Sequence, residues 1–207
     1  SIGGIVGKNM KKISNCTMKQ SKVQGDFYNG QNMQNSMIGG VVGFNSVDTS
    51  VSSCALYDCT IKGDWKVGGI GGINRGSIEE CKVDPECTIS GTDSIGGCVG
   101  SIEYDSIVQR CLIESDCTGT KNIGGVAGKI EDKGVCKNVV FTGGCSIQSI
   151  QAGYLFGFIA DTEKVMNCYY NGSNTNARLV GEAVQDTDGL YNLHSKDLQK
   201  VLCIAGI

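Results

Sequence analysis

The chain has 207 residues, of which 31 are glycine, 1 is proline and 6% are aromatic, and its formal net charge at pH 7 is −3. This glycine-rich, aromatic-poor composition is typical of thin, repetitive β-structure and argues against a large globular core. The slightly acidic balance argues against a nucleic-acid partner, and no apolar run is long enough for membrane insertion within this segment.

A glycine motif recurs from the first residues onward. In five copies an apolar residue is followed by two glycines, two small or apolar residues and a third glycine, and a sixth copy is degenerate. Between their first glycines the copies are spaced by 36, 29, 28, 28 and 29 residues, a period typical of stacked repeats. The copies begin at Ile2, Ile38, Val67, Ile95, Ile123 and Ala152.

Short apolar runs alternate with polar turns after each glycine motif. One run ends near a cysteine, as in Val51-Ser-Ser-Cys54, and a second cysteine opens another, as in Cys87-Thr-Ile-Ser-Gly91. Runs of three to six residues bounded by Gly, Asn, Asp or Ser are typical of strands and tight turns. The repeats therefore predict β-strands, with no helix in this region.

A single repeat of this length cannot bury its own apolar face, whereas stacked repeats can. We therefore predict an all-β fold, a β-solenoid (β-helix) of about six stacked coils of 28–30 residues that occupies residues 1–181. Parallel strands about 4.8 Å apart would form inward ladders of Ile, Val and Cys. The glycines would lie at tight corners or where another backbone approaches closely. Either handedness satisfies the pattern.

The remaining residues, 182–207, depart from the repeat. Ser195 is a candidate helix N-cap, Asp197 lies in the first turn, and the apolar residues up to Leu202 share one face, which predicts a short helix. This segment either caps the open end of the stack or begins a linker, so that the chain belongs to a longer protein.

The 12 cysteines occupy repeated positions, which is consistent with disulfides in an oxidising compartment. Two disulfide geometries remain open, one within coils and one between stacked coils. Buried free thiols are the alternative. The within-coil candidates are Cys54 with Cys59, Cys81 with Cys87, Cys111 with Cys117, and Cys136 with Cys145. Apart from Cys54 and Cys59, which have four residues between them, these pairs are spaced more widely than in a Cys-x(2–4)-Cys zinc knuckle, and we predict no metal.

No catalytic constellation is evident. His194 is the only histidine and lies in the atypical tail, so we interpret it as a surface residue. The glycine motifs lack the helix and the Lys-Ser/Thr ending of a phosphate-binding loop, so no cofactor is expected. We therefore predict a protein that is not an enzyme.

Aromatic residues offer a weaker candidate for a binding surface. Trp65, Tyr57, Tyr104 and Phe44 would form a sugar- or protein-binding strip if they gathered on one face. Single exposed aromatic residues are, however, common on protein surfaces.

With its repeat unit laid out, the chain resembles the GLUG-motif repeat family. The resemblance rests on the five Gly-Gly-x-x-Gly cores, on strands such as Ser77-Ile-Glu-Glu-Cys81, and on Asn167-Cys-Tyr-Tyr-Asn171. It covers nearly the whole chain. GLUG repeats are found in bacterial surface adhesins and beside immunoglobulin A protease-type peptidases, and they are not themselves the peptidase. The resemblance implies a β-solenoid stalk or adhesin-like segment, although the many cysteines depart from the common pattern.

These observations lead to one functional hypothesis and one alternative. The first is a non-enzymatic, extracellular or cell-surface structural or adhesive segment, acting as a stalk, adhesin or filament subunit. Its partner would be a host or cell-surface protein or glycan, or a second copy bound through the open solenoid ends. The alternative is an accessory glycan-binding or glycan-cleaving β-helix of a secreted hydrolase.

Overall fold

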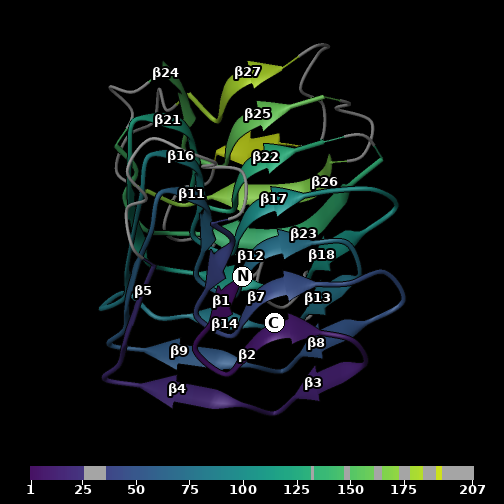
Figure 1. Ribbon diagram of the computed structural model, residues 1–207. Coiled ribbons are helices and arrows are strands. Elements are labelled where there is room, and N and C mark those ends of the chain that lie inside the picture. The colour runs from purple at the N-terminus through teal and green to yellow at the C-terminus, as the bar shows by residue number, and fades with distance from the viewer. Residues whose placement is uncertain are drawn as a thin grey trace.

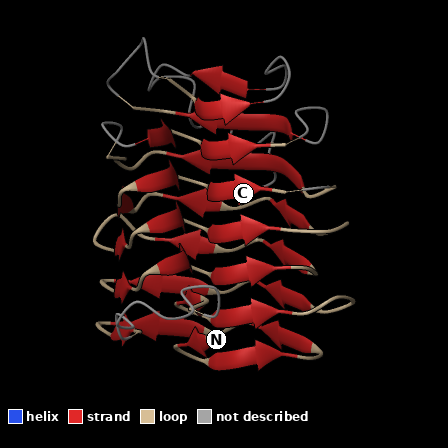
Figure 2. Ribbon diagram, turned by 45° about the horizontal axis from the view of Figure 1, so that its top comes forward, coloured by secondary structure: helices blue, strands red, loops and turns tan. Residues whose placement is uncertain are grey.

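The computed structural model describes residues 1–25, 36–131, 133–146, 150–160, 165–172, 178–183 and 190–192. In these residues the chain is all-β, and its strands stack in parallel sheets to form a β-solenoid (Figures 1 and 2), as the glycine period predicts. The helix expected near 195–202 falls outside the described residues, as does most of the expected cap at 182–207. Within the described part, no helix is long and apolar enough to cross a membrane.

Each coil passes through five rows of strands, named a to e, and every neighbouring pair is parallel. Row a contains β1 (Ile2–Gly3), β6 (Ile38–Gly39), β11 (Trp65–Gly68), β16 (Asp93–Gly96), β21 (Lys121–Gly124) and β24 (Ile150–Gly153). Row b contains β2 (Val6–Asn9), β7 (Val42–Asn45), β12 (Gly71–Asn74), β17 (Val99–Ile102), β22 (Ala127–Ile130), β25 (Phe156–Ile159) and β27 (Val180–Ala183).

The other rows complete the coil. Row c contains β3 (Lys12–Ser14), β8 (Ser50–Ser52), β13 (Ser77–Glu79), β18 (Ile107–Gln109), β23 (Val135–Phe141) and β26 (Val165–Tyr170). Row d contains β4 (Thr17–Lys19), β9 (Ala55–Tyr57), β14 (Lys82–Val83) and β19 (Leu112–Ile113), and β23 and β26 extend into it to meet β28 (Leu190–Asn192). Row e contains β5 (Lys22–Gln24), β10 (Thr60–Lys62), β15 (Thr88–Ser90) and β20 (Asp116–Thr118).

Coils 1 to 4 are β1–β5, β6–β10, β11–β15 and β16–β20, and among the described residues these four contain all five rows. Coil 5 comprises β21–β23 and ends with Cys145, which bridges to Cys117. Coil 6 comprises β24–β26. The coils follow one another from the β2–β4 end of Figure 1 to the β24–β27 end.

From the second copy onward, the apolar residue that opens each glycine motif faces the core. Ile38, Val67, Ile95 and Ile123 are register partners in row a and are fully buried, so equivalent side chains stack from coil to coil. Burial on this scale is the main favourable contribution to folding of a solenoid, because each coil covers the apolar face of the next.

The glycines lie where backbones of rows a and b pass too closely for a side chain. At Gly72 an added Cβ would lie 2.5 Å from the backbone nitrogen of Ile38 and 2.6 Å from the carbonyl oxygen of Gly43. At Gly68 it would lie 2.7 Å from the backbone nitrogen of Gly100. The motif is therefore a requirement for close backbone approach between neighbouring coils, as the sequence predicts.

A left-handed residue turns the chain between rows c and d of each coil. These residues have φ values of 52° to 56°, a region that asparagine enters more readily than most side chains. In five of the six coils a cysteine follows this residue, so the corner places a thiol at the same position of those coils. The left-handed residues are Asn15, Ser53, Glu80, Arg110, Asn138 and Asn167.

A buried asparagine ladder supports the corner between rows b and c. The side-chain amide of Asn9 donates to Oδ1 of Asn45, and that of Asn45 donates to Oδ1 of Asn74, both at 2.8 Å. The Asn74 amide ends the ladder on the carbonyl oxygen of Ile107 at 3.0 Å. The ladder satisfies polar groups inside the corner, where an unpaired group would be costly.

Candidate functional site: a notch at the edge of the stack

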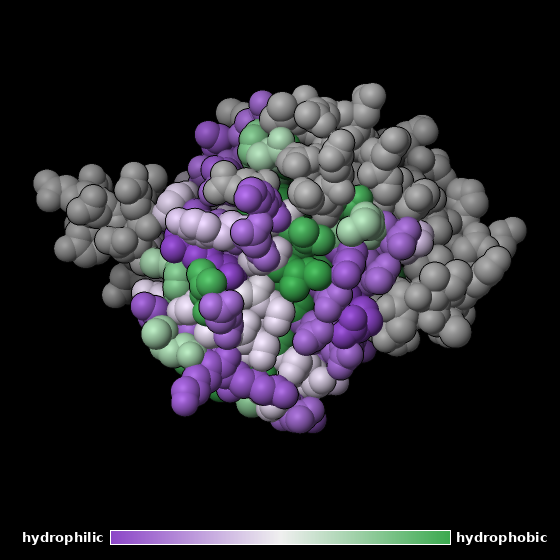
Figure 3. Space-filling view, turned by 90° about the vertical axis from the view of Figure 1, so that its right-hand side faces the viewer, coloured by the Kyte–Doolittle hydropathy of each residue, from purple (hydrophilic) through white to green (hydrophobic). Residues whose placement is uncertain are grey.

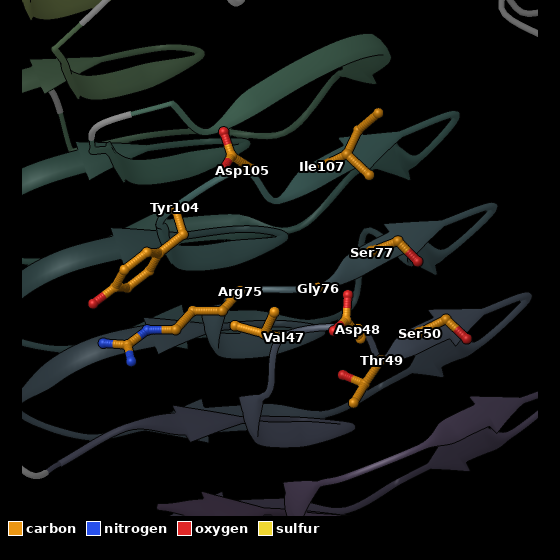
Figure 4. Close-up of a pocket in the computed structure, with 10 residues that line it drawn as sticks. All are labelled: Val47, Asp48, Thr49, Ser50, Arg75, Gly76, Ser77, Tyr104, Asp105 and Ile107. Carbon is orange, nitrogen blue, oxygen red and sulfur yellow. The ribbon is translucent and has the colours of Figure 1, made fainter.

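A short connection opens a notch in one edge of the stack. Between rows b and c, coils 2 and 4 carry residues 46–49 and 103–106, whereas coil 3 carries only Arg75 and Gly76. The missing length leaves a hollow of about 590 Å³ between the two longer loops (Figure 4). Figure 3 faces this edge, where apolar atoms lie among polar ones. The notch is lined by Val47, Asp48, Thr49, Ser50, Arg75, Gly76, Ser77, Tyr104, Asp105 and Ile107.

One wall of the notch is formed by strands of row c, and its two rims are formed by the longer loops. Ser50, Ser77 and Ile107 are register partners in row c and line one side as a vertical series. On the rims, Asp48 and Tyr104 both have a φ of 58°, and each lies in one of the longer loops. Tyr104 is 52% exposed, so its ring is available to a ligand.

Two aromatic rings hold Arg75 between them. Its guanidinium lies 4.6 Å from the ring centroid of Tyr104 and 5.1 Å from that of Phe44. Its Nε also donates to Oε2 of Glu103 at 2.9 Å. Cation–π contacts from two neighbouring coils and one charged hydrogen bond fix the orientation of this side chain at the mouth of the notch.

Behind Arg75 lies a buried ion pair. The side chains of Lys66 and Glu103 are 7% and 6% exposed, and the Lys66 ammonium contacts Oε1 of Glu103 directly. The same ammonium lies 3.8 Å from Glu131 and 4.5 Å from the ring centroid of Trp65. Burial would raise the pKa of Glu103, but hydrogen bonds and charges from Lys66 and Arg75 lower it below its usual value. Glu103 is therefore held as a carboxylate that positions both cations.

The structure gathers three of the four aromatic candidates. Phe44, Trp65 and Tyr104 all contact the Lys66–Glu103–Arg75 network, whereas Tyr57 lies apart in row d, where Lys19 covers its ring at 5.3 Å. The sequence interpretation missed all three charged residues of this network. One signal was present: Gly72 precedes Cys81 by fewer residues than Gly43 precedes Cys54 or Gly100 precedes Cys111, which marks the short connection.

The candidate cysteines are inward-facing and close to thiols of neighbouring coils. Cys54 interacts with Cys16 and Cys81, and Cys81 also interacts with Cys111. The eleven cysteines in the described residues are thiols in the structure. The hydrogen bond with Cys81 and burial raise the pKa of Cys54, which disfavours a nucleophilic thiolate.

The repeat spacing predicts a cysteine column through Cys87 and Cys117 and a threonine column through Thr60, Thr88 and Thr118, and the structure corrects both in coil 4. Cys117 is in register with Ile89 rather than with Cys87, and Thr118 is in register with Ser90 rather than with Thr88. Both are displaced by two residues because the connection between rows d and e is shorter in coil 4. Within the described residues no cluster of His, Cys, Asp or Glu has the arrangement of a metal site. His194 lies outside the described residues.

Comparison of the chain with protein-family models, with curated proteins and with solved structures found no match.

Proposed function

We propose that this chain is a non-enzymatic structural or adhesive segment of the cell surface or extracellular space, and that it contacts a saccharide through the notch. The observation that carries the proposal is Arg75, fixed between the rings of Phe44 and Tyr104 at the mouth of a hollow. A recognition site needs polar groups that are held in place before the ligand arrives, and the Arg75 guanidinium is held in place in this way.

The chemistry of the notch suits a saccharide. The exposed ring of Tyr104 offers an apolar face with a polar tip, which matches the mixed C–H and hydroxyl surface of a sugar. Asp48 and Asp105 are exposed on opposite rims, and neither forms an ion pair with any residue that the structure describes. Their carboxylates accept hydrogen bonds from ligand hydroxyls, while Arg75 donates.

The architecture suits a stalk or adhesin. Stacked coils hold the notch at a fixed position along a rigid, repetitive body, and each added coil extends the body without altering its neighbours. The resemblance to GLUG-motif repeats, which occur in surface adhesins, supports the same proposal. The raised thiol pKa values along the interior also favour a structural use of the cysteines over a catalytic one.

A saccharide array probed with the labelled chain tests the proposal. The matched variants are Tyr104→Ala, at the notch, and Tyr57→Ala, which removes a half-buried tyrosine of row d. Both rings contact a cation, Arg75 at Tyr104 and Lys19 at Tyr57. We expect binding to a subset of saccharides that Tyr104→Ala reduces at least about tenfold, equivalent to about 1.4 kcal/mol, and that Tyr57→Ala leaves unchanged. Equal loss in both variants, or no bound saccharide, would contradict it.

One observation favours a second function, glycan cleavage. Asp48 and Asp105 face the same notch from different loops, and paired carboxylates across a sugar-binding groove are the machinery of glycoside hydrolysis. Incubation of the bound saccharides with wild-type chain and with Asp48→Asn and Asp105→Asn distinguishes the two functions. Release of new reducing ends that both variants abolish would replace the adhesive proposal.

A further inference from the structure

The interior of the solenoid contains a column of thiols that runs through coils 1 to 4. Four of them follow the left-handed corner between rows c and d, and each Sγ donates to the carbonyl oxygen two residues earlier, at 3.2 to 3.4 Å. Identical corners in successive coils therefore point identical thiols along the same column. These four are Cys16, Cys54, Cys81 and Cys111.

Neighbouring thiols in this column touch. Cys54 interacts through its side chain with Cys16 below and Cys81 above, and Cys81 interacts with Cys111. The corner cysteines of coils 1 to 4 occupy stacked positions of a parallel sheet, which are about 4.8 Å apart and within the Cα separation that a disulfide spans.

In coils 5 and 6 the corner positions hold Val139 and Cys168, which are register partners. Sγ of Cys168 lies 3.7 Å from Sγ of Cys136, which lies three residues before Val139 in row c. The Cys136–Cys168 pair is placed by its sulfur–sulfur contact instead of by stacked positions.

Two further pairs of cysteines lie at row e. The backbone N–H of Cys59 donates to Sγ of Cys87 at 3.4 Å, which places that thiol directly against the coil below. Cys117 and Cys145 are register partners in a parallel bridge, and their side chains interact. The Cys117–Cys145 pair stacks on Ile89, two residues along row e from the column of Cys59 and Cys87. The two pairs therefore join coil 2 to coil 3 and coil 4 to coil 5.

We infer that five disulfides form between successive coils when the chain folds in an oxidising environment. Each cysteine of the set is used once, and the bonds alternate between the side of rows c and d and the side of row e, so that every consecutive pair from coil 1 to coil 6 is joined. The pairs are Cys16–Cys54, Cys59–Cys87, Cys81–Cys111, Cys117–Cys145 and Cys136–Cys168.

A shifted arrangement is the main competitor. Cys111 also interacts with Cys98 of its own coil, so Cys54–Cys81 together with Cys98–Cys111 would satisfy the same contacts. That arrangement joins coils 2 and 3 twice and coils 1 and 2 not at all. It also replaces two long loops by one long and one short loop, and long loops constrain the unfolded chain more. Cys98 is therefore the described cysteine that stays a thiol.

The chemistry requires an oxidant, which we take to be a small-molecule disulfide such as glutathione disulfide or a protein disulfide. One cysteine thiolate attacks the oxidant and displaces one of its thiolates, and the second cysteine then displaces the other. Two electrons pass to the oxidant, which leaves as two thiols, and the two cysteine protons are transferred to those thiols. Because burial raises the pKa of Cys136 and of Cys87, the latter to about 11, the reaction belongs to assembly of the stack, before the thiols are enclosed.

Non-reducing peptide mapping tests the pairing. The chain is refolded in a glutathione redox buffer, its free thiols are alkylated in denaturant, and it is cleaved at lysine and aspartate. Lys82 separates Cys81 from Cys87, and Asp58 separates Cys54 from Cys59, so within-coil and between-coil links give different peptides. We expect the five between-coil links. Within-coil links, the shifted arrangement or fully alkylated cysteines would overturn the inference.

Two variants test individual pairings through the number of thiols that are alkylated in denaturant. Cys117→Ser leaves Cys145 without a partner and should raise the count of alkylated thiols by one. Cys98→Ser removes an unpaired thiol and should lower the count by one. A fall in the count for Cys117→Ser would show that Cys117 is unpaired and would overturn the inference. Neither readout depends on saccharide binding, so failure here is distinct from failure of the proposed function.

Discussion

Two adjacent glycines of β12 provide a sharp test of the glycine motif. Gly71 is in register with Val42 and Val99, so side chains occupy its position in neighbouring coils. In Gly71→Ala the added Cβ meets the flexible Cδ1 of Ile78 at 3.2 Å. Alanine also lowers the entropy of the unfolded chain, so we expect this variant to be up to about 1 kcal/mol more stable than wild type.

Gly72→Ala places the same methyl group against rigid backbone. Its Cβ would lie 2.5 Å from the nitrogen of Ile38, and ordinary contact begins at 3.4 Å, so the coils must separate by nearly an ångström. Overpacking of this kind costs about 1–3 kcal/mol, and weakening one or two ladder hydrogen bonds adds about 1 kcal/mol each. We expect Gly72→Ala to lose about 3–4 kcal/mol of unfolding free energy.

Urea unfolding of both variants and wild type, followed by circular dichroism, measures the difference at constant m-value. The adjacent substitutions should differ by at least about 3 kcal/mol, with opposite signs relative to wild type. If the two unfold within about 1 kcal/mol of each other, the argument from close backbone approach is wrong.

Two further perturbations probe the ion pair and the thiol columns. Because the pKa of Glu103 is lowered, the folded chain binds fewer protons than the unfolded chain, so the contribution of Glu103 to stability is full above the usual pKa of 4.5 and is lost as pH falls through the folded value. In Glu103→Gln, the unfolding free energy from urea titrations should depend less on pH below pH 4.5 than in wild type. An unchanged pH dependence would refute the role of the ion pair. Cys117→Ser should cost about 3.5 kcal/mol more in the oxidised than in the reduced chain, because a loop between Cys117 and Cys145 is no longer closed; equal losses in both redox states would contradict that bond.

The sequence was sufficient to predict the stack because its constraint is local and repeated. Gly68 and Gly72 are required by backbone contact between adjacent coils, and the same contact recurs at every period. An inward ladder such as Ile38, Val67 and Ile95 follows from that register without further information. Repetition thus turns a weak motif into a strong prediction of fold.

The cysteine columns show where sequence spacing misleads. Because strand side chains alternate with a period of two, a connection shortened by two residues keeps the same face inward while moving each residue two positions along the neighbouring strand. Cys117 therefore still faces the core, but it lies beside Ile89 and not beside Cys87. The spacing of Cys111 and Cys117 looks like that of Cys81 and Cys87, so the shift is invisible before the strands are paired.

The notch could not be predicted from the sequence, for a related reason. Its residues come from three coils, and the hollow exists only because the coil 3 connection is shorter than those on either side. In the sequence alone, nothing distinguishes Arg75 and Glu103 from other charged residues. Their contacts with Tyr104 and Lys66 depend on the vertical register between coils, which only the structure supplies.

Filling the notch provides the most direct test of the proposed function. Insertion of Ser-Asn between Gly76 and Ser77 gives coil 3 a connection as long as residues 46–49 and 103–106, and a surface connection tolerates such an insertion at little energetic cost. Saccharide binding and urea unfolding are measured on the same sample. The proposal predicts lost binding with unchanged unfolding; binding at wild-type affinity by the filled variant would contradict it.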